Sequence, residues 1–296
     1  MVPNFARPGR LRRLLDSLEV QTLAPDRFEV VVIDDGSPPD RAPPDAWFDG
    51  EWLRLERRAN AGPAAARNRG AALARGAMLA FVDDDCVADP GWLEALWQAH
   101  EARPEALLGG RTENGLTENL YSATSESLLA FFDEEARRRG HAPALLASNN
   151  LALARAAFER IGGFDASYPL AAGEDRDLCR RWARDGGPLQ RAPEALVRHL
   201  HPLDLNGFWR QHTHYGRGAA RFRTDRRERD VIEPTDARDF HVRLLAHPLT
   251  SRPGWPLRRR LAVTALTLMS QIAIANGMLR ERLTVRPEDR PEDRPR

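Results

Sequence analysis

Apolar and polar residues alternate in two ways along the first half of the chain. Short runs of apolar, β-branched residues predict buried strands, and they occupy residues 28–33, 79–82 and 106–112. Apolar residues at helical spacing predict helices between them, at residues 11–18, 63–70, 92–100 and 119–139. This alternation predicts an α/β domain with a mostly parallel central sheet flanked by helices.

The second half continues this pattern and then changes character. A short run of leucine and alanine follows Asn150, and helices are expected at 156–161 and 173–185, with a strand at 195–199. A basic, aromatic helix is expected at 208–223, then a highly charged loop at 226–239. The tail at 286–296 repeats a Pro-charge unit, a composition typical of disorder.

The chain has little room for a strand before its first helix. Only residues 1–5 precede the helix that contains Leu11 and Leu14, with Pro8 in its first turn. We therefore expect the first strand of the sheet to be almost absent, so that either the natural start of the protein lies upstream or the domain is damaged.

Three consecutive carboxylates follow one of the predicted strands. Asp83, Asp84 and Asp85 end the apolar run at 79–82, and a Pro-Gly turn then opens a new helix. Ligands of open α/β sheets gather at the carboxyl ends of strands, and clustered carboxylates suit Mg²⁺ or Mn²⁺ and a phosphate-bearing substrate. A solvated acidic turn is the alternative for this motif alone.

The composition restricts which partners the chain can bind and which residues can contact a phosphate. The 296 residues include 44 basic and 43 acidic ones, so net charge favours neither nucleic acid nor an acidic partner. All the basic residues are arginine, so phosphate has to be met by arginine or by backbone amides. Cys86 and Cys179 form neither a disulfide framework nor a zinc motif, and no signal peptide is visible, which fits a reducing cytosol.

Several polar residues have both a structural and a functional interpretation. Arg67, one turn into its helix, fits a ligand contact or an ordinary surface arginine. Glu174 and Asp175 in a first helical turn fit helix capping as well as catalysis. His199 and His201 share one face of a strand, as metal ligands or as packing residues.

An apolar segment near the end of the chain has arginines on both sides. Residues 261–279 are long enough to span a bilayer, but five polar residues make a transmembrane helix doubtful. The flanking arginines, at 258–260, 280 and 282, favour an interfacial helix on anionic lipid. Packing on the rest of the protein is the alternative.

The order of these motifs resembles the inverting family 2 glycosyltransferases, which have the GT-A fold. The resemblance covers roughly residues 1–220, and no single motif carries it. The matching motifs are VPNFAR (2–7), VVIDDGS (31–37), NAGPAAARNRG (60–70), FVDDDC (81–86), GGFD (162–165) and GEDRDLCRR (173–181).

The resemblance implies a role for each matching residue. Pro3, Phe5, Asp35, Arg67, Asp83 and Asp84 would bind the nucleotide sugar, with Phe5 stacked on the base and Asp35 hydrogen-bonded to it. Asp83 and Asp85 would hold Mg²⁺ or Mn²⁺, with His201 as an additional contact. Asp175 would be the general base, and Glu174 would position the acceptor beside it. A single catalytic carboxylate implies inversion.

The chain departs from the family pattern in its first motif. Ala6 stands where the family usually has Asn, and Asn4 where it has Thr. Because the first strand is also expected to be almost absent, a non-catalytic sugar-nucleotide-binding or scaffold protein left after loss of that strand is a second hypothesis. A nucleotidyltransferase is a third, but it would leave the Glu174-Asp175 motif unexplained.

Taken together, the sequence predicts a Rossmann-like GT-A domain with a C-terminal helical extension. We expect the catalytic domain at 1–225, a helical, membrane-associated extension at 226–285 and a disordered tail at 286–296. The predicted substrates are a nucleoside-diphosphate sugar and a hydroxyl acceptor, a glycan or lipid-linked glycan, with no nucleic acid. The predicted location is the cytoplasm, at the inner face of the cell membrane, in cell-surface polysaccharide synthesis.

Overall fold

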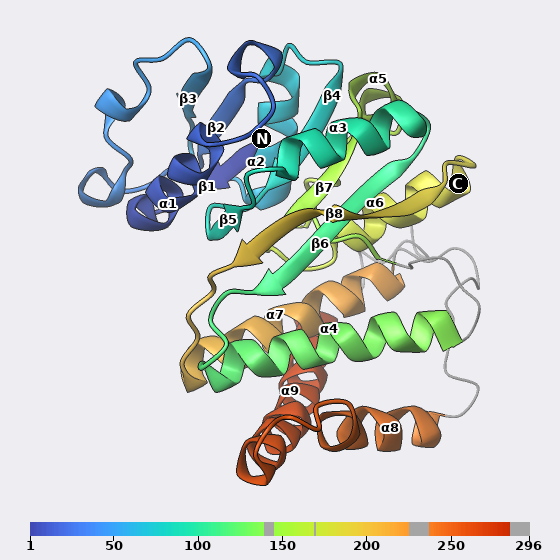
Figure 1. Cartoon of the computed structure of the whole chain (residues 1–296). Coiled ribbons are helices and arrows are strands. Elements are labelled where there is room, and N and C mark those ends of the chain that lie inside the picture. The colour runs from blue at the N-terminus through green and yellow to red at the C-terminus, as the bar shows by residue number, and fades with distance from the viewer. Residues whose placement is uncertain (139–144, 169, 225–236, 285–296) are drawn as a thin grey trace, which may run out of the picture. The chain divides into compact units, whose positions relative to one another are not determined.

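The computed structural model describes residues 1–138, 145–168, 170–224 and 237–284 (Figure 1). Most of the predicted charged loop and the whole predicted tail lie outside these residues. The chain divides into two compact units. The first comprises Met1–Gly115 and Gly140–His201, and the second comprises Leu116–Arg139 and Pro202–Arg296.

A parallel sheet begins the first unit. Its strands are β1 (Val2–Asn4), β2 (Val30–Asp34) and β3 (Leu53–Arg57), in that order. Every residue of β2 is buried, as expected for a run of β-branched residues covered on both faces. Helix α1 (Pro8–Glu19) follows β1 and buries its leucines, as their helical spacing predicted.

The first strand, expected to be almost absent, is present and three residues long. β1 pairs in parallel with β2, with Val2 opposite Val32 and Asn4 opposite Asp34. The Met1 amino group also donates a hydrogen bond of 2.8 Å to the Ala80 carbonyl, and the Val82 amide donates to the Met1 carbonyl at 3.2 Å. Three residues suffice because β1 is bonded to a strand on each side.

The second sheet of this unit has mixed strand directions. Its strands are β4 (Met78–Val82), β5 (Cys86–Ala88), β6 (Leu107–Asn114), β7 (Asn150–Ala154) and β8 (Leu189–His199), in the order β4-β7-β6-β8-β5. β6 and β8 are parallel, whereas β7 and β5 each run antiparallel to their neighbours. The α/β class is confirmed, and the parallel arrangement expected of the whole sheet holds mainly for β1–β3.

Two large hydrophobic cores cover most strands of the first unit, and a small cluster of Val31, Ile33 and Ala66 joins β2 to the helix that begins at Pro63. One includes side chains of α1 and of α3 (Trp92–Ala102), with Trp92 fully buried. The other includes side chains of α2 (Pro63–Leu73), α5 (Arg155–Arg160) and α6 (Glu174–Arg184), around Phe81 and Trp182. The alanines of α2 let that helix pack closely on the sheet.

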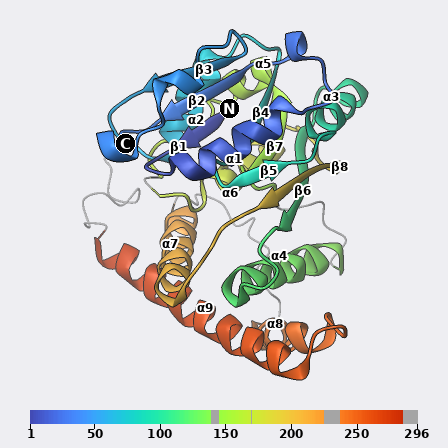
Figure 2. The same cartoon turned by 60° about the vertical axis from the view of Figure 1, so that its left-hand side comes forward.

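The second unit is built from helices. They are α4 (Leu120–Arg138), α7 (Leu205–Thr224), α8 (Ala237–Thr250) and α9 (Leu257–Thr284). α9 packs along α7 and also contacts α8 and α4 (Figure 2). The backbones of α7 and α9 touch: a Cβ added at Gly216 would lie 2.0 Å from the Ile274 carbonyl oxygen, and one at Gly277 would lie 2.0 Å from the Thr213 carbonyl oxygen.

The division into units differs from the sequence-based boundary at residue 225. α4 and α7, both expected inside the catalytic domain, belong to the same compact unit as α8 and α9. Residues 237–239, expected in a loop, form the first turn of α8. The C-terminal helical extension therefore packs with two helices that come from the predicted catalytic region.

Candidate active site

The three consecutive aspartates occupy a sharp turn between two strands. β4 ends at Val82, and the Cys86 amide that opens β5 donates a 3.1 Å hydrogen bond to the Asp83 carbonyl. Asp84 and Asp85 are buried, at 3% and 4% exposure, so the solvated-turn interpretation does not hold for them. Buried carboxylates need cationic partners or hydrogen-bond donors, and the structure supplies both.

Two histidines hold the Asp85 carboxylate. His199 Nε2 lies 3.0 Å from Asp85 Oδ1, and His201 Nδ1 lies 2.9 Å from Asp85 Oδ2. The antiparallel pairing of β5 with β8 causes this, because it sets Cys86 opposite His199. Burial alone would raise the pKa of Asp85, but the two imidazoles hold it well below its ordinary value.

Two arginines, one directly before α1 and one within it, complete the surroundings of these carboxylates. Arg7 Nη1 lies 3.1 Å from Asp84 Oδ1 and 3.3 Å from Asp85 Oδ2, and Arg10 Nη1 lies 3.1 Å from Asp85 Oδ2. Asp84 has fewer partners than Asp85, and burial raises its pKa to about 7 against the opposing effect of Arg7. The motif match contained Arg7, but nothing in the sequence singled out Arg10 among the surface arginines of a helix.

The Asp85 cluster suits a divalent metal ion. One carboxylate oxygen and two imidazole nitrogens, from Asp85, His199 and His201, lie within 4.8 Å of one another. A set of mixed oxygen and nitrogen donors fits Mn²⁺ better than Mg²⁺, which prefers oxygen alone. The predicted ligands Asp85 and His201 thus lie together, His199 joins them, and Asp83 is not part of this group of ligand atoms.

Arg67 connects the two acidic motifs. This residue of α2 is 2% exposed, so the surface-arginine interpretation is wrong. Its Nη2 donates to Asp83 Oδ1 at 2.7 Å, and its Nη1 donates to Glu174 Oε1 at 2.9 Å. Burial disfavours its charge, but the two carboxylates outweigh that effect and raise the guanidinium pKa.

Hydrogen bonds between the Asn68 side chain and the Phe164 backbone join α2 to the GGFD segment. Asn68, one residue after Arg67, donates from Nδ2 to the Phe164 carbonyl at 2.7 Å and accepts from the Phe164 amide at 2.8 Å. The Phe164 ring lies under the Arg67 guanidinium, 5.5 Å from ring centroid to Cζ. α2 therefore fastens the GGFD segment as well as both acidic motifs, a role the sequence did not reveal for Asn68.

Glu174 and Asp175 begin α6 directly after Gly173. Gly173 has φ +96°, a conformation that residues with a Cβ rarely adopt, and this turn places both carboxylates in the first helical turn. Asp175 accepts a 2.8 Å hydrogen bond from the Arg176 amide, so it also interacts with the N-terminal amides of its own helix. Burial raises the pKa of Asp175 and raises that of Glu174 to about 7.

Asp35 is occupied by backbone donors. Its carboxylate accepts hydrogen bonds from the amides of Ala61, at 3.1 and 3.2 Å, and Gly62, at 2.8 Å. It therefore fastens the loop that leads into α2. Pro3 lies within β1 and is partly buried, and Phe5 follows this strand directly and is 45% exposed. That these two residues contact the nucleotide stays a prediction.

Ala6, the departure from the family pattern, is held in a strained conformation. Its φ of +56° lies in the left-handed region, which Asn tolerates much better than Ala. Its amide donates to Ser37 Oγ at 2.6 Å, and its carbonyl accepts from Arg41 at 2.9 Å. The turn after β1 is thus kept although the residue that favours it is missing.

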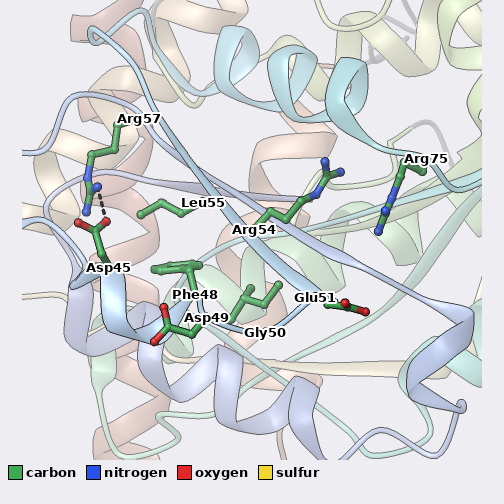
Figure 3. A pocket seen from close by; sticks show the side chains of 10 residues that line it. Asp45, Phe48, Asp49, Gly50, Glu51, Arg54, Leu55, Arg57 and Arg75 are labelled. Carbon is green, nitrogen blue, oxygen red and sulfur yellow. Dashed lines mark hydrogen bonds and ion pairs between the residues drawn. The ribbon is translucent and has the colours of Figure 1, made fainter.

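One cavity of about 860 Å³ lies beside the edge strand β3 (Figure 3). Its lining is of mixed charge and includes Arg54, Arg57 and Arg75 together with Asp45 and Glu51. Arg57 and Asp45 form an ion pair across it. The predicted site residues are not among those that line it, and the arginines are already paired with protein groups.

Comparison with known proteins identifies the family. Residues 1–162 match the model of Glycosyl transferase family 2, and the chain belongs to this family. It is 33% identical to the Pre-mycofactocin glycosyltransferase of Mycobacterium tuberculosis over 74% of this chain and 46% of that protein. It is 32% identical to the Validoxylamine A glucosyltransferase of Streptomyces hygroscopicus over 64% of this chain and 48% of that protein. The chain thus spans about half the length of these curated relatives.

Solved structures confirm the GT-A fold. A mannosyltransferase from Pyrobaculum calidifontis, in complex with GDP-Man and Mn²⁺, superposes with a TM-score of 0.60 at 17% identity, covering 94% of this chain and 85% of that one. GalNAc-T7 with UDP, GalNAc and Mn²⁺ gives a TM-score of 0.54 at 13% identity, over 92% of this chain and 54% of that one. The α/β, GT-A prediction is therefore correct.

Proposed function

We propose that this chain transfers a sugar from a nucleoside-diphosphate donor to a hydroxyl acceptor, with inversion at the anomeric carbon. The observation that carries the proposal is the pair of ion pairs made by Arg67. They hold Asp83, next to the candidate metal cluster, and Glu174, next to the candidate base, on one buried guanidinium. Donor and acceptor groups are then fixed relative to each other before substrates arrive, which favours catalysis by proximity.

The donor side of the site needs positive charge for the leaving diphosphate. Asp85, His199 and His201 would hold a divalent ion, with Mn²⁺ preferred over Mg²⁺ by the donor set. Such an ion supplies Lewis-acid stabilisation of the negative charge that develops on the leaving group. Arg7 and Arg10, already beside these carboxylates, would add charge-assisted hydrogen bonds to the phosphates.

The acceptor side needs a base. Asp175 is half-buried, and its raised pKa suits a carboxylate that takes a proton from a hydroxyl group. Glu174 is held by Arg67 and cannot turn toward the acceptor without breaking that ion pair, so we assign it to positioning. One base without a second nucleophilic carboxylate accounts for direct displacement and inversion.

The comparisons support the substrate class. The two solved neighbours hold GDP-Man or UDP with Mn²⁺, and one relative is named for glucosyl transfer to Validoxylamine A. A hexosyl donor fits all three. The acceptor, whether a cell-surface glycan, a lipid-linked glycan or a smaller molecule, and a cytoplasmic location at the membrane are parts of the proposal that rest on the sequence alone.

The deciding experiment compares Asp175→Asn with the unchanged protein in a transfer assay. We expect transfer to fall ~10²–10⁴-fold while donor binding persists. Donor binding is measured as a thermal shift with UDP, GDP, dTDP and CDP, each with and without Mn²⁺. Full transfer activity in Asp175→Asn would sink the assignment of the base.

The rival hypothesis of a non-catalytic protein has lost its basis. It rested on the loss of the first strand, and β1 is present and bonded on both sides. A nucleotide that binds with Mn²⁺ but supports neither transfer nor hydrolysis would bring it back.

A further inference from the structure

One helix of the second unit is apolar on the side away from its partners. Of the residues that the structure describes, one segment, Leu257–Leu283 in α9, is long and apolar enough to cross a membrane. Such a test is weak evidence alone, because core helices of soluble proteins also pass it. The positions of its buried and exposed residues decide more.

The buried face of α9 belongs to the second unit. Val263, Thr267, Ser270, Ala273 and Gly277 are buried, at spacings of three or four residues that keep them on one face. Glu281 continues this face and pairs with Arg217 of α7, Nε to Oε2 at 2.7 Å. A helix fastened along one side by polar contacts to its neighbours is not suited to cross a bilayer by itself.

The opposite face carries a continuous aliphatic stripe. Its large residues are each at least half exposed, and they are Leu257, Leu261, Leu268, Ile272, Leu279 and Leu283. Their spacing alternates between four and seven residues, which gives a repeat of eleven residues. Because eleven residues make three turns of an α-helix, the stripe runs straight along α9. At 1.5 Å per residue it is about 40 Å long.

The charges of α9 identify what this stripe fits. The helix contains one acidic residue, the buried Glu281, and five arginines, of which Arg258, Arg280 and Arg282 are exposed near its two ends. Before its first turn, Trp255 lies between Arg252 and Arg259, 5.4 and 4.6 Å from ring centroid to Cζ. Tryptophan and arginine around an aliphatic face are typical of helices that lie in the interface of an anionic membrane.

A second copy of the chain fits less well. If two copies paired through the stripe, an antiparallel arrangement would bring Arg258 near Arg282, and a parallel one would bring each arginine near its own counterpart. Neither arrangement offers an exposed carboxylate on α9, so like charges would repel. An anionic lipid surface complements both the apolar stripe and the arginines.

We propose that α9 binds the surface of an anionic lipid bilayer, with its aliphatic stripe in the membrane interface and its arginines on the lipid phosphates. This binding is independent of glycosyl transfer, so either proposal can fail alone.

The test measures co-sedimentation of the whole chain with lipid vesicles. One set contains phosphatidylcholine alone, and the other an equimolar mixture of phosphatidylcholine and phosphatidylglycerol. We expect binding to the mixed vesicles, weakened by salt, and little binding to the neutral ones.

Two variants separate the contributions. Leu268→Gln/Ile272→Gln changes two exposed side chains of the stripe and should weaken binding tenfold or more. Arg258→Gln/Arg282→Gln should remove most of the preference for anionic vesicles. Val20→Gln, an equally exposed aliphatic residue of the first unit, is the matched control and should bind as the unchanged chain does.

Circular dichroism and thermal unfolding show that the variants remain folded. Equal binding to both kinds of vesicle, or unchanged binding by the stripe variant, would overturn the proposal. So would a dimer in light scattering that does not bind vesicles and that Leu268→Gln/Ile272→Gln converts to monomer.

Discussion

Two strand ends of the first unit have nearly the same sequence and opposite surroundings. β2 runs into Asp34-Asp35, and β4 runs into Asp83-Asp84-Asp85. Asp35 accepts three hydrogen bonds from backbone amides of the loop before α2 and has one arginine partner, Arg58, at 3.4 Å. Asp85 has side-chain partners instead, two imidazoles and two guanidinium groups. Backbone donors are fixed by the fold, but side chains can move away when a ligand arrives. The comparison suggests that Asp35 holds structure and that Asp85 is available to a ligand.

The largest effect expected from this comparison is on Asp85. Asp85→Asn removes the carboxylate charge that the metal ion needs, so transfer activity should fall about a hundredfold or more. The Mn²⁺-dependent part of the nucleotide thermal shift should disappear with it. Asp84→Asn is the matched control, because its pKa of about 7 leaves that carboxyl already partly neutral. Equal losses in both variants would contradict the special place of Asp85.

The second prediction concerns the stability of the loop before α2. In Asp35→Asn the amide group can accept fewer of the bonds from Ala61 and Gly62, so the free energy of unfolding should fall by about 1–3 kcal/mol. Denaturant unfolding without nucleotide measures this loss. If stability is unchanged while nucleotide binding is lost, Asp35 acts on the base, as the family resemblance implies.

The third prediction concerns the acidic pair Glu174-Asp175 and the dependence of transfer activity on pH. The proposed base Asp175 must be ionised to accept a proton, and burial raises its pKa, so kcat/KM should decline on the acid side at a pH above the ordinary value of 3.8. Below that pKa the rate should fall about tenfold per pH unit, because the protonated form accumulates. The profile is measured at saturating Mn²⁺, so that loss of the proposed metal ion does not contribute to the acid limb. An acid limb at or below pH 3.8 would contradict the raised pKa.

The smallest expected effect tests the strained turn after β1. Ala6→Gly relieves a left-handed conformation, and the gain in unfolding free energy should be about 0.5–1 kcal/mol after the greater chain entropy of glycine is counted. Ala6→Asn should stabilise as well, because Asn tolerates this conformation. Thermal unfolding measures both, with Ala24→Gly, whose φ of −55° is ordinary, as the control that should not stabilise. A loss of stability in both Ala6 variants would show that the strain is compensated elsewhere.

Sequence reasoning found the strand ends and missed some of their partners. Periodicity located the helices other than α8 and most of the longer strands, because apolar runs and helical spacing reflect burial directly, but it gave no signal for the short strand β5. His199 was noticed but not assigned, because its contact with Asp85 depends on β5, three residues with no signal of their own. Arg10 and Asn68 were missed for a related reason: their partners come from segments distant in the sequence. The mixed directions of β5 and β7 depend on the same long-range pairing.

The second unit was harder to predict. α9 was expected from its apolar length, but its division into a packed and an exposed face depends on α7, which supplies Gly216 and Arg217. α8 has a proline within it and a weak apolar pattern, so nothing separated it from the charged loop before it. Its formation depends on partners such as Phe131 and Glu135 of α4.

The position of Arg67 has a consequence for protein engineering. One guanidinium, supplied by residues 60–70, neutralises carboxylates from two other motifs, so these three segments are electrostatically coupled. If the segment 81–86 or 173–181 were replaced by that of a relative, the carboxylate that pairs with the buried Arg67 could be displaced. The guanidinium would then lack one of its two buried partners. Chimeras that alter donor preference separately from acceptor preference should therefore keep this trio intact and vary the surrounding loops instead.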